Sequence, residues 1–307
     1  MDKLKTPVLL IVFNRPEQTR QVLETLKQSK PQKLYIAADG PRVGNKSDIN
    51  KLEQVNTIIK NISWDCEVKK NFSDTNLGCR TRISSAIDWI FQSEEQAIIL
   101  EDDIIADPSF FNFCQEMLQK YKDNDQISMV SGVNILDGEF KFDSSYFFTK
   151  FGGIWGWATW RRSWKDYDVE MQEWKEHKER GNLFKEFLTT KEWNAFNDKW
   201  KWLWRENIQT WDYQWDFARF KSSSLSIVPS KNLIRNIGFG EQSTHTKQKD
   251  HEYSNLRTYS ISWPIRHPKS ISVNPDYEKR YVEKVLHESL FVRLKKKVKD
   301  LIFGFNN

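Results

Sequence analysis

The first 130 residues alternate short apolar runs with segments of helical spacing. The apolar runs have the length of buried strands and lie at Val8–Phe13, Leu34–Ala38, Cys66–Lys69, Ala97–Leu100 and Ile127–Val130. Between them, apolar residues recur every three or four positions, as in Val22, Leu23 and Leu26 after Pro16. Alternating strands and helices are typical of a mostly parallel central sheet flanked by helices. The sequence therefore predicts an α/β fold for this half.

The pattern changes after about residue 145, where tryptophan becomes frequent. Eleven of the 14 tryptophans lie between Trp155 and Trp215, so this segment has a role of its own. No linker or repeat interrupts the chain, and we expect one domain with two halves and an extension. The predicted boundaries are 1–250 for the domain, 1–130 for a nucleotide-binding half, 131–250 for a Trp-rich acceptor half and 251–307 for the extension.

Polar residues directly follow three of the predicted strands. They are Arg15 after the first, Asp39 after the second and the triplet Glu101, Asp102, Asp103 after the strand that ends at Leu100. Ligands of open α/β sheets bind beyond the carboxyl ends of the strands, so these clusters are expected to share one crevice. Arg15 suits a phosphate or a planar base, and Asp39 suits a base N–H or a ribose hydroxyl.

The acidic triplet is the strongest single signal for a metal. Three adjacent carboxylates repel one another unless a cation lies among them, and hard oxygen ligands suit Mn²⁺ or Mg²⁺ shared with phosphate. The alternative is a solvated acidic turn before the helix that begins at Asp107 and Pro108. His245, in a loop loosened by Gly238 and Gly240, is a further candidate for metal or diphosphate.

The tryptophan segment suggests a sugar site, since carbohydrates bind to flat aromatic faces beside polar groups. Trp155, Trp157 and Trp211 are the candidates for binding an acceptor, although most tryptophans in any protein belong to the core. Asp212 and Asp216 lie one helical turn apart among large rings, which raise a carboxyl pKa toward the range of a general base. Either of them is alternatively a partner of Arg205 or Arg219.

Composition narrows the class of protein. The apolar fraction is 38% and the charged fraction 29%, and no apolar run approaches the ~20 residues of a membrane span. The net charge of +5 is mild and the body of the chain has no basic block, so we expect no nucleic-acid partner. The first residues lack signal-peptide features and the three cysteines show no close pairing, so a cytoplasmic protein is expected.

The last residues carry a different charge pattern. Five basic residues lie between Arg293 and Lys299, and the tail contains only one acid, Asp300. Apolar residues recur at helical spacing from Leu290 to Phe305. The pattern predicts a basic amphipathic helix over 289–307, of the kind that lies on an anionic membrane surface. The alternative is a terminal helix docked on the protein with its lysines in solvent.

Taken in order, these residues resemble the GT-A glycosyltransferases, specifically bacterial relatives of the N-acetylglucosaminyltransferase I family (family 2-like glycosyltransferases). The match runs over about residues 5–245. The acidic triplet with Asp107 and Pro108 is similar to the metal motif of that family, and Phe13–Arg15 is similar to its first strand and nucleotide-contacting arginine. Asp39 resembles an acid that touches the base.

Two further segments extend the resemblance. Asn76–Arg80 looks like the loop and helix start that face the donor, and Arg80 is its donor-binding candidate. Trp211 with Asp212 is similar to the catalytic segment, although that family has two adjacent acids where Tyr213 follows Asp212 here. Asp212 is the preferred base, and Asp216 stays a candidate.

The resemblance implies an inverting, metal-dependent transferase that moves a hexosyl or N-acetylhexosaminyl group from a nucleotide-diphosphate sugar, in the first place a UDP-sugar. Asp103 would bind the metal and Asp102 the ribose, and Glu101 is a further donor-binding candidate. The acceptor would be a glycan or a lipid-linked sugar of bacterial surface polysaccharide, at the inner face of the cell membrane. The alternatives are a sugar-nucleotide pyrophosphorylase, for which a glycine-rich basic loop after the first strand is lacking, and a non-catalytic carbohydrate-binding module.

Overall fold

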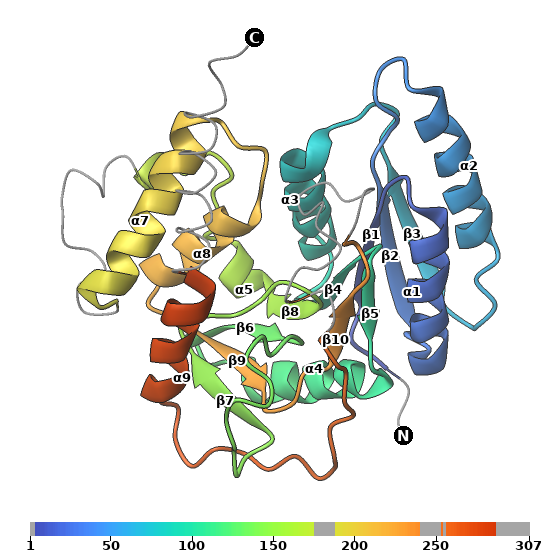
Figure 1. Ribbon diagram of the computed structural model, residues 1–307. Helices are drawn as coiled ribbons and strands as arrows, with labels where there is room; N and C mark the ends of the chain where they lie inside the picture. Colours follow the sequence, from blue (N-terminus) through green and yellow to red (C-terminus); the bar gives the residue numbers. More distant parts are fainter. Residues whose placement is uncertain (1–3, 175–187, 240–252, 254–255, 287–307) are drawn as a thin grey trace.

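An eight-stranded sheet runs through the molecule, with the strand order β3-β2-β1-β4-β8-β6-β9-β7 (Figure 1). Its strands are β1 (Val8–Val12), β2 (Lys33–Ala38), β3 (Glu67–Phe72), β4 (Gln96–Glu101), β6 (Ile127–Ser131), β7 (Tyr146–Thr149), β8 (Trp157–Trp160) and β9 (Leu225–Pro229). A separate two-stranded sheet pairs β5 (Ile104–Ala106) with β10 (Ile234–Asn236). The computed structural model describes residues 4–174, 188–239, 253 and 256–286.

Helices cover both faces of the sheet, as the alternation of strands and helices predicted (Figure 1). They are α1 (Pro16–Ser29), α2 (Lys46–Lys60), α3 (Gly78–Phe91), α4 (Pro108–Lys120), α5 (Arg161–Trp164), α7 (Thr190–Arg205), α8 (Asp212–Lys221) and α9 (Pro275–Tyr281), with a π-helical turn at Val282–Leu286. Within the described residues, none of these helices has the length and apolarity needed to cross a membrane.

Successive residues of β1 point to opposite faces and so determine which helix packs where. Leu10 joins a buried cluster that includes residues of α1, α2 and α4, whereas Leu9 joins one that includes residues of α3 and α8. The strand is buried over its whole length, which explains its unbroken apolar sequence. Full burial of an aliphatic side chain of this size contributes roughly 1.5–3 kcal/mol.

Most strands of the sheet run in one direction, as predicted, but two run antiparallel to their neighbours. β3, β2, β1 and β4 are parallel neighbours, but β8 runs antiparallel between β4 and β6, and β7 runs antiparallel to β9. β8 has the sequence Trp-Ala-Thr-Trp, and all four residues are buried. This strand belongs to the segment whose tryptophans suggested a sugar-binding surface, so part of that segment instead completes the sheet.

Asn45 caps α2, because its side chain accepts a hydrogen bond from the backbone N–H of Asp48 (3.1 Å). The tryptophans of α7 do not form one packed face. Trp200 is fully buried, whereas Trp204 is exposed.

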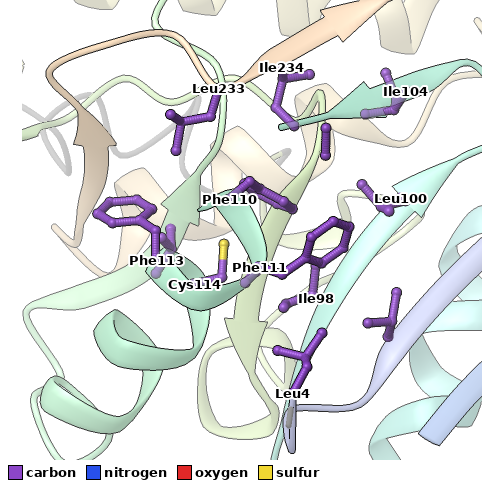
Figure 2. Packing of buried hydrophobic residues seen from close by; sticks show 14 of the residues in the cluster. Leu4, Ile98, Leu100, Ile104, Phe110, Phe111, Phe113, Cys114, Leu233 and Ile234 are labelled. Atoms are coloured by element: carbon purple, nitrogen blue, oxygen red, sulfur yellow. The ribbon is translucent and has the colours of Figure 1, made fainter. Parts of the chain in front are cut away.

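The small sheet joins the two halves of the chain next to the end of β4. Ile234 pairs with Ala106, and both halves contribute to the buried cluster beneath, as Figure 2 shows for Ile104, Phe110 and Ile234. The pairing continues past β10, where the backbone N–H of Ile237 donates to the carbonyl of Asp103 (2.8 Å). The segment after β10 is thereby held against the acidic triplet.

Candidate functional site

The acidic triplet lies where β4 ends beside β1. Ile11 is the register partner of Glu101, so the residues that follow β1 reach the turn at Asp102 and Asp103. The backbone N–H of Phe13 donates to Asp102 Oδ2 (2.9 Å). Arg15 Nη1 donates to Asp102 Oδ1 (3.1 Å) and to Asp103 Oδ2 (2.6 Å), so the predicted meeting of these two strand ends is present.

The triplet carries more negative charge than its surroundings compensate. Burial raises the pKa of Glu101 to about 8, and the carboxylates of Asp103 and Asp102 raise it further. Burial also raises the pKa of Asp102 to about 6, although Arg15 acts against this shift. A site that holds carboxylates at such a cost fits a divalent cation, which would offset the repulsion. The oxygen donors of this set suit Mn²⁺ or Mg²⁺.

The geometry of a complete metal centre is not assembled in the described part of the chain, where no three His, Cys, Asp or Glu side chains form a metal-holding group. Asp102 is buried and Glu101 is half-buried, and 13% of the side chain of Asp103 is exposed. Its predicted partner His245 lies outside the described residues. The metal therefore stays a prediction that rests on the chemistry of the triplet.

Asp39 has a different role from the predicted one. Its Oδ1 accepts from the backbone N–H of Gly40 (3.0 Å) and Leu77 (2.8 Å), and its Oδ2 accepts from Asn76 Nδ2 and the N–H of Gly78 (both 3.0 Å). A carboxylate has about four acceptor positions, and here four donors occupy them. We therefore revise Asp39 from a donor-binding residue to one that positions the start of α3.

Asp212 comes to the same strand ends from the second half of the chain. It is the first residue of α8, and its Oδ1 accepts a hydrogen bond from Thr210 Oγ1. Its carboxylate is near enough to the triplet to contribute to the raised pKa of Glu101. The prediction that Asp212 and Asp216 lie one turn apart on a helix is confirmed.

Asp216 is held by an arginine. Arg219, whose side chain is fully buried, lies 3.7 Å from Asp216 Oδ1 through its Nη1, and its Nη2 donates to the backbone carbonyl of Lys150. Burial raises the pKa of Asp216 to about 6, Arg219 opposes the shift, and the Asp212 carboxylate adds to it. Among the described contacts, Asp216 forms an ion pair with Arg219 and Asp212 does not.

Cys79 marks the centre of this neighbourhood, and the sequence gave no reason to single it out. Burial raises the pKa of its thiol, and the carboxylates of Glu101, Asp212 and Asp39 raise it further, while Arg15 lowers it. One half-buried side chain near the start of α3 thus responds to charges from β1, β2, β4 and α8. Arg15, Asp39, Glu101 and Asp212 therefore lie near one another around Cys79.

Gly238 closes one side of the site. A Cβ built on this residue would lie 2.0 Å from Asp103 Oδ2 and 2.8 Å from Asp103 Cγ. Its backbone N–H donates to Asn236 Oδ1 (2.7 Å), which fixes the turn after β10. The sequence offered a signal here, since Gly238 stood out in a glycine-rich loop, but nothing in it indicated contact with the triplet.

The three predicted acceptor-binding tryptophans separate in the structure. Trp157 and Trp211 are 1% and 3% exposed and stack on each other at 5.6 Å between ring centroids. We correct their predicted role, because these rings pack in the core beneath the site and offer no face to a sugar. Trp155 is half-buried and meets Phe239 edge-on at 5.6 Å, next to Gly238, so it stays the acceptor candidate.

Arg80 lies on the first turn of α3 and reaches the second half of the chain. Its Nη2 is 3.6 Å from Glu170 Oε1, and its Nη1 donates to Asn207 Oδ1 (3.4 Å). The donor-binding role predicted for Arg80 is not tested by these contacts. They show that α3 and the segment between α7 and α8 meet at the edge of the site.

Comparison with known proteins gives a fold-level likeness only. No family model matches the chain, and no curated protein matches it. UDP-glucose pyrophosphorylase complexed with UDP-glucose has a TM-score of 0.33 and 11% identity over 53% of this chain and 78% of that one. HddC from Yersinia pseudotuberculosis has a TM-score of 0.32 and 14% identity over 53% and 80%.

The apo form of UDP-glucose pyrophosphorylase covers more of the chain, with a TM-score of 0.37 and 10% identity over 73% of this chain and 90% of that one. These likenesses agree with a mixed α/β chain that has a large central sheet between helices. UDP-glucose pyrophosphorylase matches the pyrophosphorylase alternative by name, and none of these neighbours is named as a glycosyltransferase. TM-scores this low carry no argument about what the present chain does.

Proposed function

We propose that the chain is a metal-dependent, inverting glycosyltransferase that uses a nucleotide-diphosphate sugar, in the first place a UDP-sugar. The observation that carries the proposal is the position of Asp212. It reaches the strand-end acids from the second half of the chain, and its carboxylate acts on Glu101. Transfer of a sugar to a hydroxyl group requires removal of a proton, and a carboxylate at the junction of the halves suits that task.

The residues after β1 favour this reaction over nucleotidyl transfer. In a pyrophosphorylase a sugar phosphate attacks the α-phosphorus of a nucleoside triphosphate and pyrophosphate leaves, so the nucleophile is already an anion and the site must hold many phosphate charges. Here only three residues separate β1 from α1, and the single cation among them, Arg15, is paired with Asp102 and Asp103. Such a short connection has no room for a glycine-rich basic loop.

The triplet would hold the metal through Asp103, with Asp102 and Glu101 beside it. A bound Mn²⁺ or Mg²⁺ supplies positive charge to the diphosphate that departs with the nucleotide. Arg80 lies at the edge of the site and is proposed to bind the donor, and Asp102 is proposed to reach its ribose. His245 keeps its predicted role as a further ligand of metal or diphosphate.

Asp212 is proposed to accept the acceptor's hydroxyl proton. The hydroxyl oxygen then bonds to the anomeric carbon on the face opposite the diphosphate, the bond from that carbon to the diphosphate breaks, and configuration inverts. Trp155, with Phe239 against its ring, is proposed to bind a face of the acceptor sugar. Positioning of the two substrates between the halves would supply much of the rate.

The two alternatives make different demands on the chain. A non-catalytic carbohydrate-binding module needs exposed rings, and the burial of Trp157 and Trp211 removes two of its three candidates. The pyrophosphorylase alternative shares its name with neighbours in the structure comparison. It predicts that pyrophosphate, not a nucleoside diphosphate, is the small product.

The first test is a thermal-shift screen of nucleotide sugars with and without Mn²⁺, followed by product analysis. A ligand that binds only the folded state raises the melting temperature. We expect a manganese-dependent rise with one UDP-sugar, and slow release of UDP on long incubation. Consumption of UTP and a sugar 1-phosphate with release of pyrophosphate would instead establish the pyrophosphorylase.

The variant Asp212→Asn tests whether Asp212 is the catalytic base independently of donor binding. The variant should show the same donor-induced shift as the wild type and lose at least ~100-fold in turnover, the usual contribution of a general base. Asp74→Asn, at an exposed aspartate in the loop after β3, is the matched control and should keep its turnover. Near wild-type turnover of Asp212→Asn would place the base elsewhere.

A further inference from the structure

Four large apolar side chains are exposed at the end of the sheet where β2 and β3 finish. Among the described residues they are Val43, which is 104% exposed, Ile49 (47%), Phe72 (40%) and Leu77 (39%), and we call these four the docking rim. They follow β2 and β3 or begin the next helices, α2 and α3. Exposed apolar residues scattered singly need no explanation, but a group of them marks an interaction surface.

Backbone contacts hold the segments of the docking rim next to one another. Phe72 is the register partner of Ala38 at the end of β2. Gly40 approaches residue 75 so closely that a Cβ on it would lie 2.5 Å from the backbone carbonyl carbon of Thr75. The backbone N–H of Leu77 donates to Asp39. The loop after β2 and the loop after β3 therefore present one surface.

This surface borders the proposed active site. Asp39 supports both the rim, through Leu77, and the start of α3, where Cys79 lies among the site's carboxylates. Across the site, Arg80 contacts Asn207, just beyond the C-terminal end of α7. Figure 1 shows the loop from β2 to α2, the start of α3 and that end of α7 together at the top of the molecule.

Exposed basic side chains outnumber acidic ones around the rim, where Asp74 is an exposed acid between Phe72 and Leu77. Residues 40–51 contain three basic side chains and one acid, and that acid, Asp48, is buried and paired with Arg42 at 2.6 Å. Lys46 and Lys70 are exposed beside Val43 and Phe72 in the sequence. Exposed apolar side chains with lysines around them are the combination that binds an anionic bilayer, where apolar groups enter the interface and cations meet the headgroups.

We propose that the docking rim binds the surface of an anionic lipid bilayer and so turns the strand-end site toward the membrane. The substrate class follows, and this step rests on the proposed function: the acceptor is a sugar carried on a membrane lipid. The residues of this surface lie between positions 43 and 77 and so do not include the basic tail predicted over 289–307.

The test is flotation of the full chain with vesicles of equal parts phosphatidylglycerol and phosphatidylcholine, and with vesicles of phosphatidylcholine alone. The wild type should float with the anionic vesicles and remain below with the neutral ones. Val43→Glu with Phe72→Glu should reduce anionic binding at least tenfold. Tyr259→Glu, at a similarly exposed ring outside the rim (38% exposed), should leave it unchanged.

A second chain, truncated after residue 288, identifies what the tail contributes. If the truncated chain keeps salt-sensitive binding that the rim substitutions remove, the rim is a membrane surface. If truncation alone abolishes binding, or the rim variant floats like the wild type, the proposal is wrong. If the wild type does not bind anionic vesicles and instead binds a protein partner through the rim, the proposal is also wrong.

A measurement of donor binding distinguishes failure of the membrane proposal from failure of the proposed function. The rim variant should keep the manganese-dependent thermal shift with a UDP-sugar, which also shows that it is folded. Wild-type flotation without any such shift would support the membrane surface and contradict the glycosyltransferase. A thermal shift with a UDP-sugar but no flotation would support the glycosyltransferase and contradict the membrane surface.

Discussion

At the scale of single residues, Gly238 has no space for a side chain, because a Cβ would fall 2.0 Å from Asp103 Oδ2. The carboxylate belongs to a turn already held by Arg15, and the segment after β10 is held by Ile237, so neither partner moves freely. We expect Gly238→Ala to weaken manganese-dependent donor binding by about tenfold, a free-energy change of ~1.4 kcal/mol. Titration of the UDP-sugar by calorimetry measures the change.

Gly138→Ala serves as its control. Gly138 has φ +86° and open space around its Cβ, so the substitution strains the backbone without touching the site. It should lower the melting temperature and leave the donor dissociation constant unchanged. Equal donor affinities for Gly238→Ala and the wild type would mean that Asp103 does not need its present position.

Asp216 should make the chain less stable as pH rises, whereas an ordinary carboxylate salt bridge makes a protein more stable as pH rises. Its pKa in the folded state is about 6, above the ordinary aspartate value of 3.8, so the folded chain holds its proton more tightly than the unfolded chain between these pH values. Stability therefore falls as pH rises from about 4 to about 6. Asparagine mimics the protonated acid, so Asp216→Asn should match the wild type near pH 3, where the folded and unfolded chains both hold the proton, and exceed its stability at pH 7.

Urea denaturation of both proteins at the two pH values provides the measurement. A variant that is less stable than the wild type at pH 7 would mean that attraction to Arg219 outweighs the burial of the carboxylate, contrary to the direction of the pKa shift.

The positions of the acids were predictable from sequence at this scale, but their partners were not. Each acid follows an apolar run, and that is visible in the chain. Whether Asp39 is open to a ligand depends on Asn76, Leu77 and Gly78, which come 37 to 39 residues later and occupy its oxygens. The role of Gly238 likewise depends on a pairing between distant strands.

At the scale of elements, one buried lysine ties three of them together. Lys150 follows β7, and its Nζ lies 2.8 Å from Glu192 Oε2 on α7 and 3.1 Å from Glu278 Oε2 on α9. Glu192 also completes the capping box of α7 with Thr189, so the same carboxylate begins the helix and anchors it. All three charged residues of this cluster are buried.

Lys150→Met should therefore destabilise the chain more than an average substitution. It leaves two buried carboxylates without their cation, which costs about 3–5 kcal/mol and lowers the melting temperature by roughly 10 °C. Lys191→Met, at an exposed lysine on α7, should change it by less than ~1 °C. Adding Glu278→Gln to Lys150→Met should recover part of the loss, and no recovery would mean that the lysine acts through packing alone.

Elements with regular apolar spacing were predictable from the sequence, whereas β8 was not. The helix after Pro16 lies where the spacing of Val22, Leu23 and Leu26 placed it. β8 carries two tryptophans in four residues, a pattern shared by a buried strand and a sugar-binding surface. Only its pairing with β4 and β6 distinguishes the two.

At the scale of the whole molecule, the same strand makes the first half dependent on the second. β8 covers the edge of β4, pairing Thr159 with Ala97 and Ala158 with Ile98. Leu233 and Ile234 also fill the cluster around Phe110 (Figure 2). A fragment of residues 1–130 would expose a long apolar strand edge and part of this cluster, which favours association between chains.

We therefore expect residues 1–130 to aggregate when expressed alone and to become soluble when co-expressed with residues 131–307, because the second fragment restores β8 and β10. Size-exclusion chromatography and urea unfolding of the co-expressed pair measure both effects. The whole chain is the reference, and its unfolding should be a single transition that includes both halves. A soluble, monomeric fragment 1–130 with its own cooperative unfolding would show that the nucleotide-binding half is an independent domain, and Asp212 would then reach the site across a domain boundary rather than through a shared sheet.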